Sequence, residues 1–181
     1  MKIVGITGTN ASGKGTIVDY LVKNKNFTHY SVRAFLIQEL EKRNLPVDRD
    51  HMRELGNELR ANFWPAYIIE QLYAQAQEQG GDAIIESIRT VGEVQNLKGK
   101  ENFLLLSVDA EQKTRYERIL KRGSETDSVT FEEFQIQEEK EMNNTDPAKQ
   151  NVAECMKLAD LQIRNDGTFE DLYQKLDEIF G

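Results

Sequence analysis

The chain has 181 residues, of which 39% are hydrophobic and 30% are charged, and its formal net charge is −8. This length suits a single domain over residues 1–181, and the negative charge argues against long nucleic acid as a partner, because neutralising phosphates needs a basic surface. No apolar run approaches the roughly 20 residues that cross a membrane. The apolar start in MKIVGIT is also shorter than a signal peptide's core, so we expect a cytoplasmic protein without membrane contact. The single cysteine, Cys155, excludes an internal disulfide.

Short apolar runs alternate with helical patterns along the chain. Runs typical of buried strands cover residues 2–7, 28–32, 82–87, 102–110 and 159–167. Apolar residues at helical spacing predict helices over residues 13–26, 34–46, 48–79 with a bend at Pro65, 91–100, 111–123, 131–142 and 168–180. Asp109 and Thr130 are predicted helix caps, because Gln112 and Glu133 follow them by three residues. This alternation predicts a parallel α/β sheet with helices on both faces.

The stretch GITGTNASGKGT, residues 5–16, joins the first predicted strand to the first predicted helix. Gly8, Gly13 and Lys14 satisfy the pattern G-x-x-x-x-G-K in the context that this pattern requires. Glycines let the backbone wrap closely around phosphate oxygens, and the free N–H groups at a helix start favour negative charge. A simple tight turn would need neither the lysine nor the paired glycines. The stretch therefore predicts a phosphate-binding loop in which Lys14 reaches the terminal phosphates.

Gly15 stands where many such loops carry the Ser or Thr that binds magnesium, and Thr16 follows one place later. With this G-K-G-T loop the chain resembles the adenylate kinase and nucleoside monophosphate kinase family. The resemblance implies that Thr16 contacts the α-phosphate, that Gly15 binds no metal, and that an acidic residue orients the waters of magnesium. It also implies the three-layer fold of P-loop NTPases, with a five-stranded parallel sheet, a helical acceptor-binding insert and a short lid.

The segment AIIESIRT places Glu86 at the end of a predicted strand and Arg89 three residues later. Ligands of open α/β sheets bind at the carboxyl ends of the strands, so both side chains are expected to face the glycine loop. A carboxylate there can hold the waters of magnesium or accept a proton, and a guanidinium can bind a phosphate by two hydrogen bonds. A solvated salt bridge at a strand end is the alternative.

The resemblance extends to this segment. Adenylate kinases carry an Asp here followed by an Arg that binds the acceptor phosphate. Phage-type deoxynucleotide kinases and dephospho-coenzyme A kinase-like archaeal proteins carry D-x-x-R with a nearby Glu, which Glu93 resembles. Glu86 is longer than the family's Asp, and we expect it to reach magnesium through water.

Three arginines are candidates for binding the acceptor phosphate. Arg53 and Arg60 lie seven residues apart, and so on one helical face. Their segment is similar to a helix of deoxynucleoside monophosphate kinases, and Arg33 occupies the region where monophosphate kinases begin their acceptor-binding helix. A solvated helix charge is the alternative for each of them.

Two aromatic residues and two histidines have side chains that can take part in binding or catalysis. Phe63 and Trp64 could stack on a base, although core packing or a wedge at the helix bend is the stronger expectation. His29 and His51 have no partner at the spacing of a zinc site or a nucleophile triad. We therefore assign no chemistry to either histidine.

Arg115, Arg118 and Arg122 lie at helical spacing just before a polar loop. Phosphoryl transfer is catalysed mainly by positioning and by cations on the developing charge, while a lid excludes water. Arg118 and Arg122 fall where adenylate kinases carry lid arginines, one near the adenine and one on the phosphates. A surface ion pair with Glu111, four residues earlier, is the alternative to a lid role, chiefly for Arg115.

The segment ADLQIRNDG, residues 159–167, resembles a turn of dephospho-coenzyme A kinases and phage deoxynucleotide kinases. The resemblance implies that Asn165, Asp166 and Gly167 lie beside the donor adenine through their backbone groups. A tight turn without this role explains the segment equally well.

These observations together predict an ATP-dependent phosphotransferase. We expect a small-molecule kinase that uses ATP and Mg²⁺ to phosphorylate a nucleoside or deoxynucleoside 5′-monophosphate; the alternatives are a dephospho-coenzyme A kinase and an ATP-binding regulatory protein without phosphotransfer. The single domain is expected to comprise a core of residues 1–47 and 82–181, an acceptor insert of residues 48–79 and a lid at about residues 122–130. The predicted site residues are Lys14, Glu86, Arg89 and Arg122 for catalysis; Gly8, Asn10, Ala11, Ser12, Gly13, Lys14, Gly15, Thr16, Arg118, Asn165 and Gly167 for ATP; Arg33, Arg53, Arg60 and Arg89 for the acceptor; and Glu86, through water, for the metal.

Overall fold

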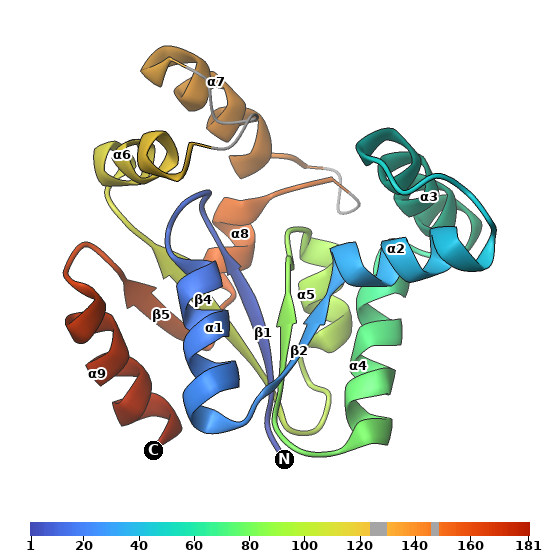
Figure 1. Cartoon of the computed structure of the whole chain (residues 1–181), viewed down its shortest axis with the longest axis horizontal. Coiled ribbons are helices and arrows are strands. Elements are labelled where there is room, and N and C mark those ends of the chain that lie inside the picture. Colours follow the sequence, from blue (N-terminus) through green and yellow to red (C-terminus); the bar gives the residue numbers. More distant parts are fainter. Residues whose placement is uncertain (124–129, 146–148) are drawn as a thin grey trace.

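A computed structural model describes residues 1–123, 130–145 and 149–181, without the side chains of Arg49, Asp50 and Arg53. Within these residues, five strands form one parallel sheet in the order β2-β3-β1-β4-β5. The strands are β1 (Ile3–Gly8), β2 (Thr28–Ser31), β3 (Ala83–Glu86), β4 (Phe103–Asp109) and β5 (Leu161–Arg164). Their carboxyl ends meet at one edge of the sheet (Figure 1), where Ile6 pairs with Glu86 and Gly8 with Val108. The predicted five-stranded parallel sheet is confirmed.

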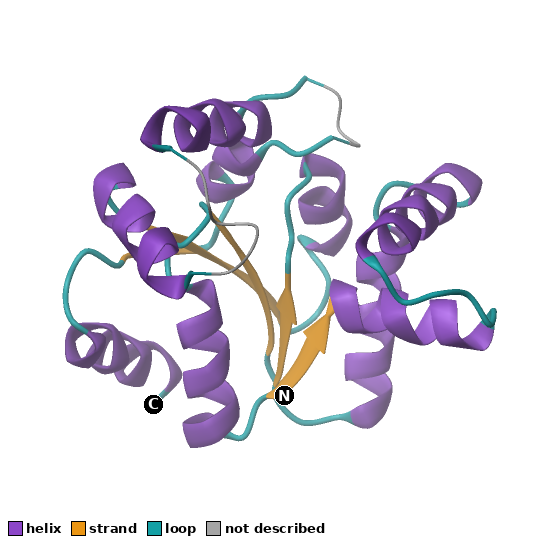
Figure 2. Cartoon of the chain, turned by 45° about the horizontal axis from the view of Figure 1, so that its top comes forward, coloured by secondary structure: helices purple, strands orange, loops and turns teal. Residues whose placement is uncertain are grey.

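Helices cover both faces of this sheet (Figure 2). Successive strand residues point to opposite faces, so neighbouring residues of β1 enter different hydrophobic clusters: Val4 lies in one and Ile3 in the other. The cluster around Val4 includes side chains of α1 (Lys14–Lys25) and α9 (Phe169–Phe180). The cluster around Ile3 includes side chains of α2 (Val32–Lys42), α4 (Tyr67–Gln79), α5 (Val91–Leu97) and α8 (Val152–Lys157). The strands are thus buried on both faces, which explains their continuous apolar sequence.

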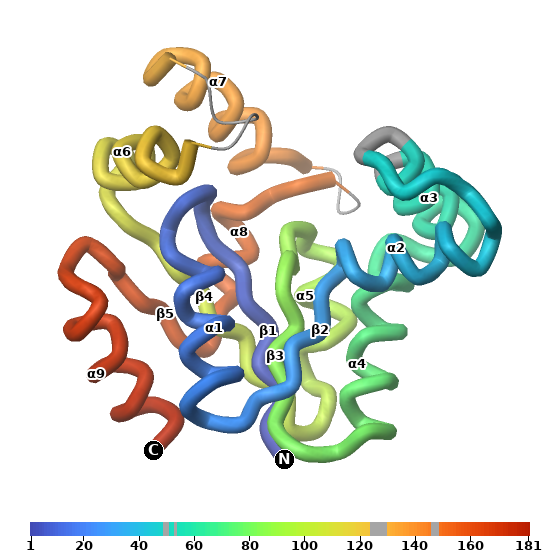
Figure 3. The backbone as a smooth tube through the Cα atoms, in the orientation of Figure 1, coloured from blue at the N-terminus to red at the C-terminus, as the bar shows by residue number. Residues whose placement is uncertain are grey.

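Three further helices lie toward the edge where the strands end. The helices α6 (Gln112–Arg122) and α7 (Phe131–Met142) lie above the ends of β1 and β4, and α3 (Arg49–Asn62) lies beyond α2 (Figure 3). Of the segment predicted as an insert, α3 packs on α2 and α4, whereas α4 itself packs on β2 and β3. The division into core, insert and lid stays a prediction, and residues 124–129 of the proposed lid lie outside the described residues.

The structure tests two predicted helix caps. The capping box of Thr130 and Glu133 is confirmed, but the cap at Asp109 is wrong. Helix α6 begins at Gln112 with Glu111 as its cap residue, and Asp109 remains in β4, where it pairs with Arg164. The Asp109 carboxylate instead accepts a hydrogen bond of 2.7 Å from Thr9 Oγ1, because strand pairing keeps its backbone extended.

Of the two expectations for Phe63 and Trp64, core packing is wrong, whereas a wedge at the helix bend stays a prediction, since both residues lie between the end of α3 and the start of α4. Phe63 is 52% exposed and Trp64 is 43% exposed. The ring of Phe63 stacks on that of Tyr67, with centroids 4.2 Å apart. These rings pack on one another at the surface rather than in the core.

Among the described helices, none is both long and apolar enough to span a membrane.

Candidate functional site

The loop between β1 and α1 follows a path that only glycine permits at two positions. Gly8 and Gly13 have φ angles of 137° and 105°. A Cβ atom on Gly8 would collide with the backbone of Val108, and one on Gly13 would collide with the side chain of Asn165. No side chain caps the start of α1, so its first N–H groups are available to an anion. The backbone therefore has the geometry that the predicted phosphate loop needs.

Lys14 lies across this loop. Its Nζ atom donates hydrogen bonds to the carbonyl oxygens of Gly8 at 2.9 Å and Thr9 at 2.6 Å. The pKa of Lys14 is lowered to about 8, mainly because burial removes water from the ammonium group and next because Arg89 is positive; Glu86 raises it. An anionic ligand would favour the charged lysine again. Lys14 is thus a half-buried, partly desolvated cation suited to binding a phosphate.

The loop opens into a cavity of about 850 Å³, a size typical of small-molecule sites. The cavity brings together most of the predicted ATP and catalytic residues, namely Asn10, Ala11, Gly13, Lys14, Gly15, Thr16, Glu86, Arg89, Arg118, Arg122, Asn165 and Gly167. Its lining also includes four residues that were not predicted: Lys121, Thr168, Phe169 and Glu170. Segments from four parts of the chain therefore converge on one opening beside the glycine loop.

Glu86 lies at the end of β3, on the wall of this cavity. Its Oε2 atom lies 2.8 Å from Nε2 of His29, which β2 supplies. This hydrogen bond is the main cause that lowers the pKa of Glu86, and the positive charges of Lys14 and Arg89 act in the same direction. His29, to which the sequence assigned no chemistry, is therefore the direct partner of a predicted site residue. Only the pairing of β2 with β3 brings the two together, so no local sequence signal could have found this contact.

Arg118 and Asn165 join the far wall of the cavity to the glycine loop. A terminal nitrogen of Arg118 donates to the backbone oxygen of Asn165 at 2.8 Å, and the Asn165 amide donates to the backbone oxygen of Ser12 at 2.8 Å. Ser12 is fully buried and is not among the residues that line the cavity. It contributes a backbone oxygen that holds Asn165, which does line the cavity. The segment after β5 is thus attached directly to the phosphate loop.

Arg115 has a different partner from the one expected. It is buried and forms an ion pair with Glu138 of α7, not with Glu111. Its guanidinium also donates to the carbonyl oxygens of Ala110 at 2.8 Å and Asn10 at 3.3 Å. The surface pair with Glu111 is therefore wrong, because α7 covers this side of α6. Arg115 connects α7 to the glycine loop instead of facing solvent.

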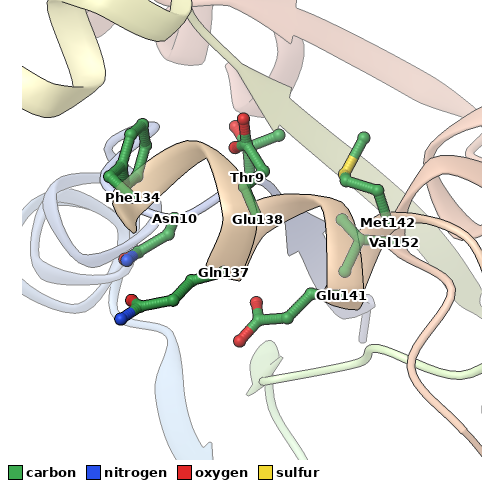
Figure 4. A pocket seen from close by; sticks show the side chains of 8 residues that line it. All are labelled: Thr9, Asn10, Phe134, Gln137, Glu138, Glu141, Met142 and Val152. Carbon is green, nitrogen blue, oxygen red and sulfur yellow. The ribbon is translucent and has the colours of Figure 1, made fainter. Parts of the chain in front are cut away.

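A second, smaller cavity lies between the glycine loop and α7 (Figure 4). Its volume is about 30 Å³, close to the share of liquid volume of one water molecule. It is lined by Thr9, Asn10, Phe134, Gln137, Glu138, Glu141, Met142 and Val152. This space is too small for a nucleotide, so we assign the ligand to the larger cavity.

The predicted acceptor arginines are not all brought to the large cavity. Arg89 lines it, whereas Arg33 and Arg60 do not, and the side chain of Arg53 lies outside the described residues. Arg60 lies 4.0 Å from Oε1 of Glu93. Glu93 is buried, and its other oxygen accepts the backbone N–H groups of Arg89 at 2.9 Å and Thr90 at 3.1 Å. Arg60 is thus linked to the Arg89 loop through a buried carboxylate.

The donor set at the cavity fits a metal that is held mainly by phosphates and water. In the described parts of the chain, no group of three or more His, Cys, Asp or Glu side chains could hold a metal ion. The wall includes Glu86, which offers a carboxylate, and Thr16, which offers a hydroxyl. Magnesium keeps several waters and needs only one or two carboxylates when phosphates are present. These residues suit Mg²⁺ that arrives with a nucleotide.

Comparisons with known proteins agree with this fold. A family model described as an AAA domain matches residues 4–145. The chain is 28% identical over 182 residues to a UPF0200 protein of Methanocaldococcus jannaschii, covering 99% of this chain and 89% of that protein.

Two kinases are similar in structure. Shikimate kinase from Bacteroides thetaiotaomicron has a TM-score of 0.62 at 14% identity, covering 98% of this chain and 97% of that one. Dephospho-CoA kinase from Campylobacter jejuni has a TM-score of 0.58 at 16% identity, covering 99% and 96%. At these identities the likeness shows the fold alone, which is that of P-loop kinases.

Proposed function

Because the chain belongs to the AAA-domain family and has the fold of P-loop kinases, we propose that it is an ATP-dependent kinase acting on a nucleoside or deoxynucleoside 5′-monophosphate. One observation carries this proposal. The cavity beside the glycine loop gathers the cations Lys14, Arg89 and Arg118 around a single opening. Such a concentration of cations in a protein of net charge −8 suits a ligand with several phosphates.

The donor half of the cavity is assigned to ATP. The N–H groups at the start of α1 and the Lys14 ammonium bind the β- and γ-phosphates, and Thr16 contacts the α-phosphate. Arg118 and the backbone near Asn165 border the adenine. In support, a terminal nitrogen of Arg118 donates a hydrogen bond of 2.8 Å to the backbone oxygen of Asn165, which holds both groups on one side of the cavity. Magnesium bound with ATP supplies neutralising charge on the phosphates, and Glu86 orients its waters. Arg122, also on the wall, binds the charge that develops during transfer.

The acceptor half is assigned to the side of Arg89. Arg89 binds the acceptor phosphate and holds it in line with the donor, where positioning and charge supply most of the catalysis. Arg33 and Arg53 remain candidates for the same phosphate. The ion pair of Arg60 with Glu93 supports an indirect role for Arg60, because Glu93 holds the backbone on which Arg89 is carried.

A second candidate is an acceptor with a hydroxyl group, such as dephospho-coenzyme A. A hydroxyl acceptor must lose a proton during transfer, whereas a phosphate oxygen need not. Glu86 is an ionised carboxylate on the cavity wall, so it can accept a proton, and its lowered pKa makes it a weaker base than an ordinary glutamate. The similar solved structures include a dephospho-CoA kinase, which adds support to this alternative.

An ADP-release assay separates these candidates. The purified chain is incubated with Mg²⁺ and ATP and with each of AMP, CMP, UMP, GMP, their deoxy forms and dephospho-coenzyme A. We expect a monophosphate to raise ADP release above the ATP-only rate, and Lys14→Ala to abolish that increase. Lys157→Ala is the matched control, because Lys157 is 73% exposed and does not line the cavity.

The other outcomes decide against the proposal. Activity with dephospho-coenzyme A alone would favour the second candidate. Tight ATP binding without turnover on any acceptor would favour a regulatory ATP-binding protein, which is the remaining alternative. In either case the monophosphate kinase assignment would be abandoned.

A further inference from the structure

His29 and Glu86 lie on neighbouring parallel strands near the edge where the strands end. In the register of β2 and β3, His29 pairs with Ile84, so His29 and Glu86 point to the same face of the sheet. Their Nε2 and Oε2 atoms are 2.8 Å apart. Both side chains are about one-third exposed, at 34% and 33%. The contact is therefore a well-formed hydrogen bond at the wall of the cavity, not a deeply buried core contact.

The chemistry of the pair gives this hydrogen bond a direction. A glutamate carboxylate on the wall of an open cavity is ionised at neutral pH, and such a carboxylate only accepts hydrogen bonds. His29 Nε2 must therefore carry the proton and donate it to Oε2. Within the described part of the chain, the other oxygen of Glu86 makes no hydrogen bond. The imidazole thus occupies one oxygen and leaves the other to the cavity that Glu86 lines.

Two cations compete with His29 for this carboxylate. Lys14 and Arg89 share the cavity wall with Glu86, and the charges of both lower its pKa. Even so, the Lys14 ammonium bonds to the carbonyl oxygens of Gly8 and Thr9 rather than to Glu86. Without the imidazole, the ionised carboxylate of Glu86 would be drawn toward the ammonium group on the same cavity wall. A direct pair between Lys14 and Glu86 would remove both groups from a phosphate ligand.

We propose that His29 is a positioning residue for the magnesium nucleotide, which by its hydrogen bond directs the free oxygen of Glu86 into the cavity and keeps the carboxylate away from Lys14. The free oxygen then orients the waters of Mg²⁺, and Lys14 stays available to phosphate. This inference rests on the proposed function, and in particular on Glu86 acting on the metal through water.

The test compares ATP affinity in Mg²⁺ with ATP affinity in EDTA by isothermal titration calorimetry. The ratio of the two dissociation constants measures how much magnesium strengthens binding. We expect His29→Ala to reduce this ratio by about 3- to 10-fold, as the loss of one ordinary hydrogen bond between partly exposed side chains implies. His29→Gln should largely restore the ratio, because its amide N–H can donate to the same oxygen. Glu86→Gln should lower the ratio, and His29→Ala should lower it no further in that background.

The chain offers a matched control in its other histidine. His51 Nδ1 lies 2.7 Å from Asp48 Oδ2 at the start of α3, and neither residue lines the cavity. His51→Ala removes a similar histidine–carboxylate contact and should leave the ratio unchanged. Far-ultraviolet circular dichroism and the melting temperature check that each variant folds.

Several results would overturn the inference. An unchanged ratio in folded His29→Ala, or an equal loss in His29→Gln and His29→Ala, would exclude positioning through the hydrogen bond. A wild-type chain that binds no ATP would refute the proposed function itself. If wild type binds Mg·ATP and Glu86→Gln lowers the ratio while His29→Ala does not, only the role of His29 fails.

A second measurement serves if His29→Ala does not fold. The chain has two histidines, so ¹⁵N labelling of histidine gives Nδ1 and Nε2 signals from two imidazole rings in the NMR spectrum of wild type. Glu86→Gln and the addition of Mg·ATP should both shift the Nε2 signal of His29, while the signal of His51 stays in place. A His29 signal that moves in neither case would overturn the inference.

Discussion

The lowered pKa of Lys14 lets us predict how the affinity for ATP falls as the pH rises. With a pKa of about 8 in the free protein, Lys14 loses most of its charge between pH 7.5 and 9.5. ATP phosphates bind the charged form and raise this pKa, so affinity must fall by up to tenfold per pH unit above 8. Across that range we expect ATP to bind roughly 20-fold more weakly at the alkaline end. Because about three-quarters of Lys14 is deprotonated at pH 8.5 with this pKa, binding there should also take up about 0.75 of a proton.

Calorimetry in buffers of different ionisation enthalpy measures both quantities. Titrations of Mg·ATP into the chain at pH 7.5, 8.5 and 9.5 give the affinity, and the dependence of heat on the buffer gives the proton uptake. Lys14→Arg is the control, because a guanidinium does not titrate in this range. An affinity that is constant with pH in wild type, or equal proton uptake in Lys14→Arg, would refute the argument that Lys14 is a desolvated phosphate ligand.

Three further predictions concern the groups that support the site. Glu138→Gln removes the nearer of two carboxylates that pair with the buried Arg115, and the other, Asp109, stays 3.7 Å away. The change should lower the free energy of unfolding in urea by about 2 kcal/mol; a loss under 0.5 kcal/mol would contradict this. Burial raises the pKa of Glu93, so its contribution to stability is present at acid pH and lost as pH rises through the folded-state pKa. Glu93→Gln should therefore flatten the pH dependence of stability above pH 4.5, the ordinary value of the group, and an unchanged slope in thermal melts would argue against it. Burial also raises the pKa of the Cys155 thiol to about 12, so iodoacetamide at pH 8 should leave it unmodified in the native chain and alkylate it in urea, as mass spectrometry of both samples would reveal.

Local chemistry was enough to predict the framework of the molecule. The apolar run before Gly8, the glycine pattern and the helical spacing after Lys14 predict a strand, a phosphate loop and a helix without any distant contact. The order of strands and helices then restricts the chain to a parallel sheet, because parallel strands need crossover connections. The positions of Glu86 and Arg89 follow from the same rule, since ligands bind where such strands end.

Packing between distant segments decided the partners of each charged group. The spacing of Arg115 favours a pair with Glu111, yet α7 lies over α6 and supplies Glu138 instead. The seven-residue spacing from Arg53 favours Arg60 as a ligand of the acceptor phosphate, but the fold places its guanidinium 4.0 Å from the buried carboxylate of Glu93 in α5. The Asp109 cap failed for the same reason, since pairing of β4 with β5 overrides a local turn signal.

The sequence by itself determined that this chain has a phosphate loop in a parallel α/β sheet, because both follow from the backbone preferences and periodicity of nearby residues. Only the tertiary structure decided which side chains act together. The periodicity of nearby residues does not determine the order of strands in a sheet. Nothing near Glu86 in the chain therefore indicates that its hydrogen-bond partner is His29, 57 residues earlier. The loss of water around a side chain likewise depends on the whole fold. It lowers the pKa of Lys14, whereas the sequence shows only that this residue is a lysine.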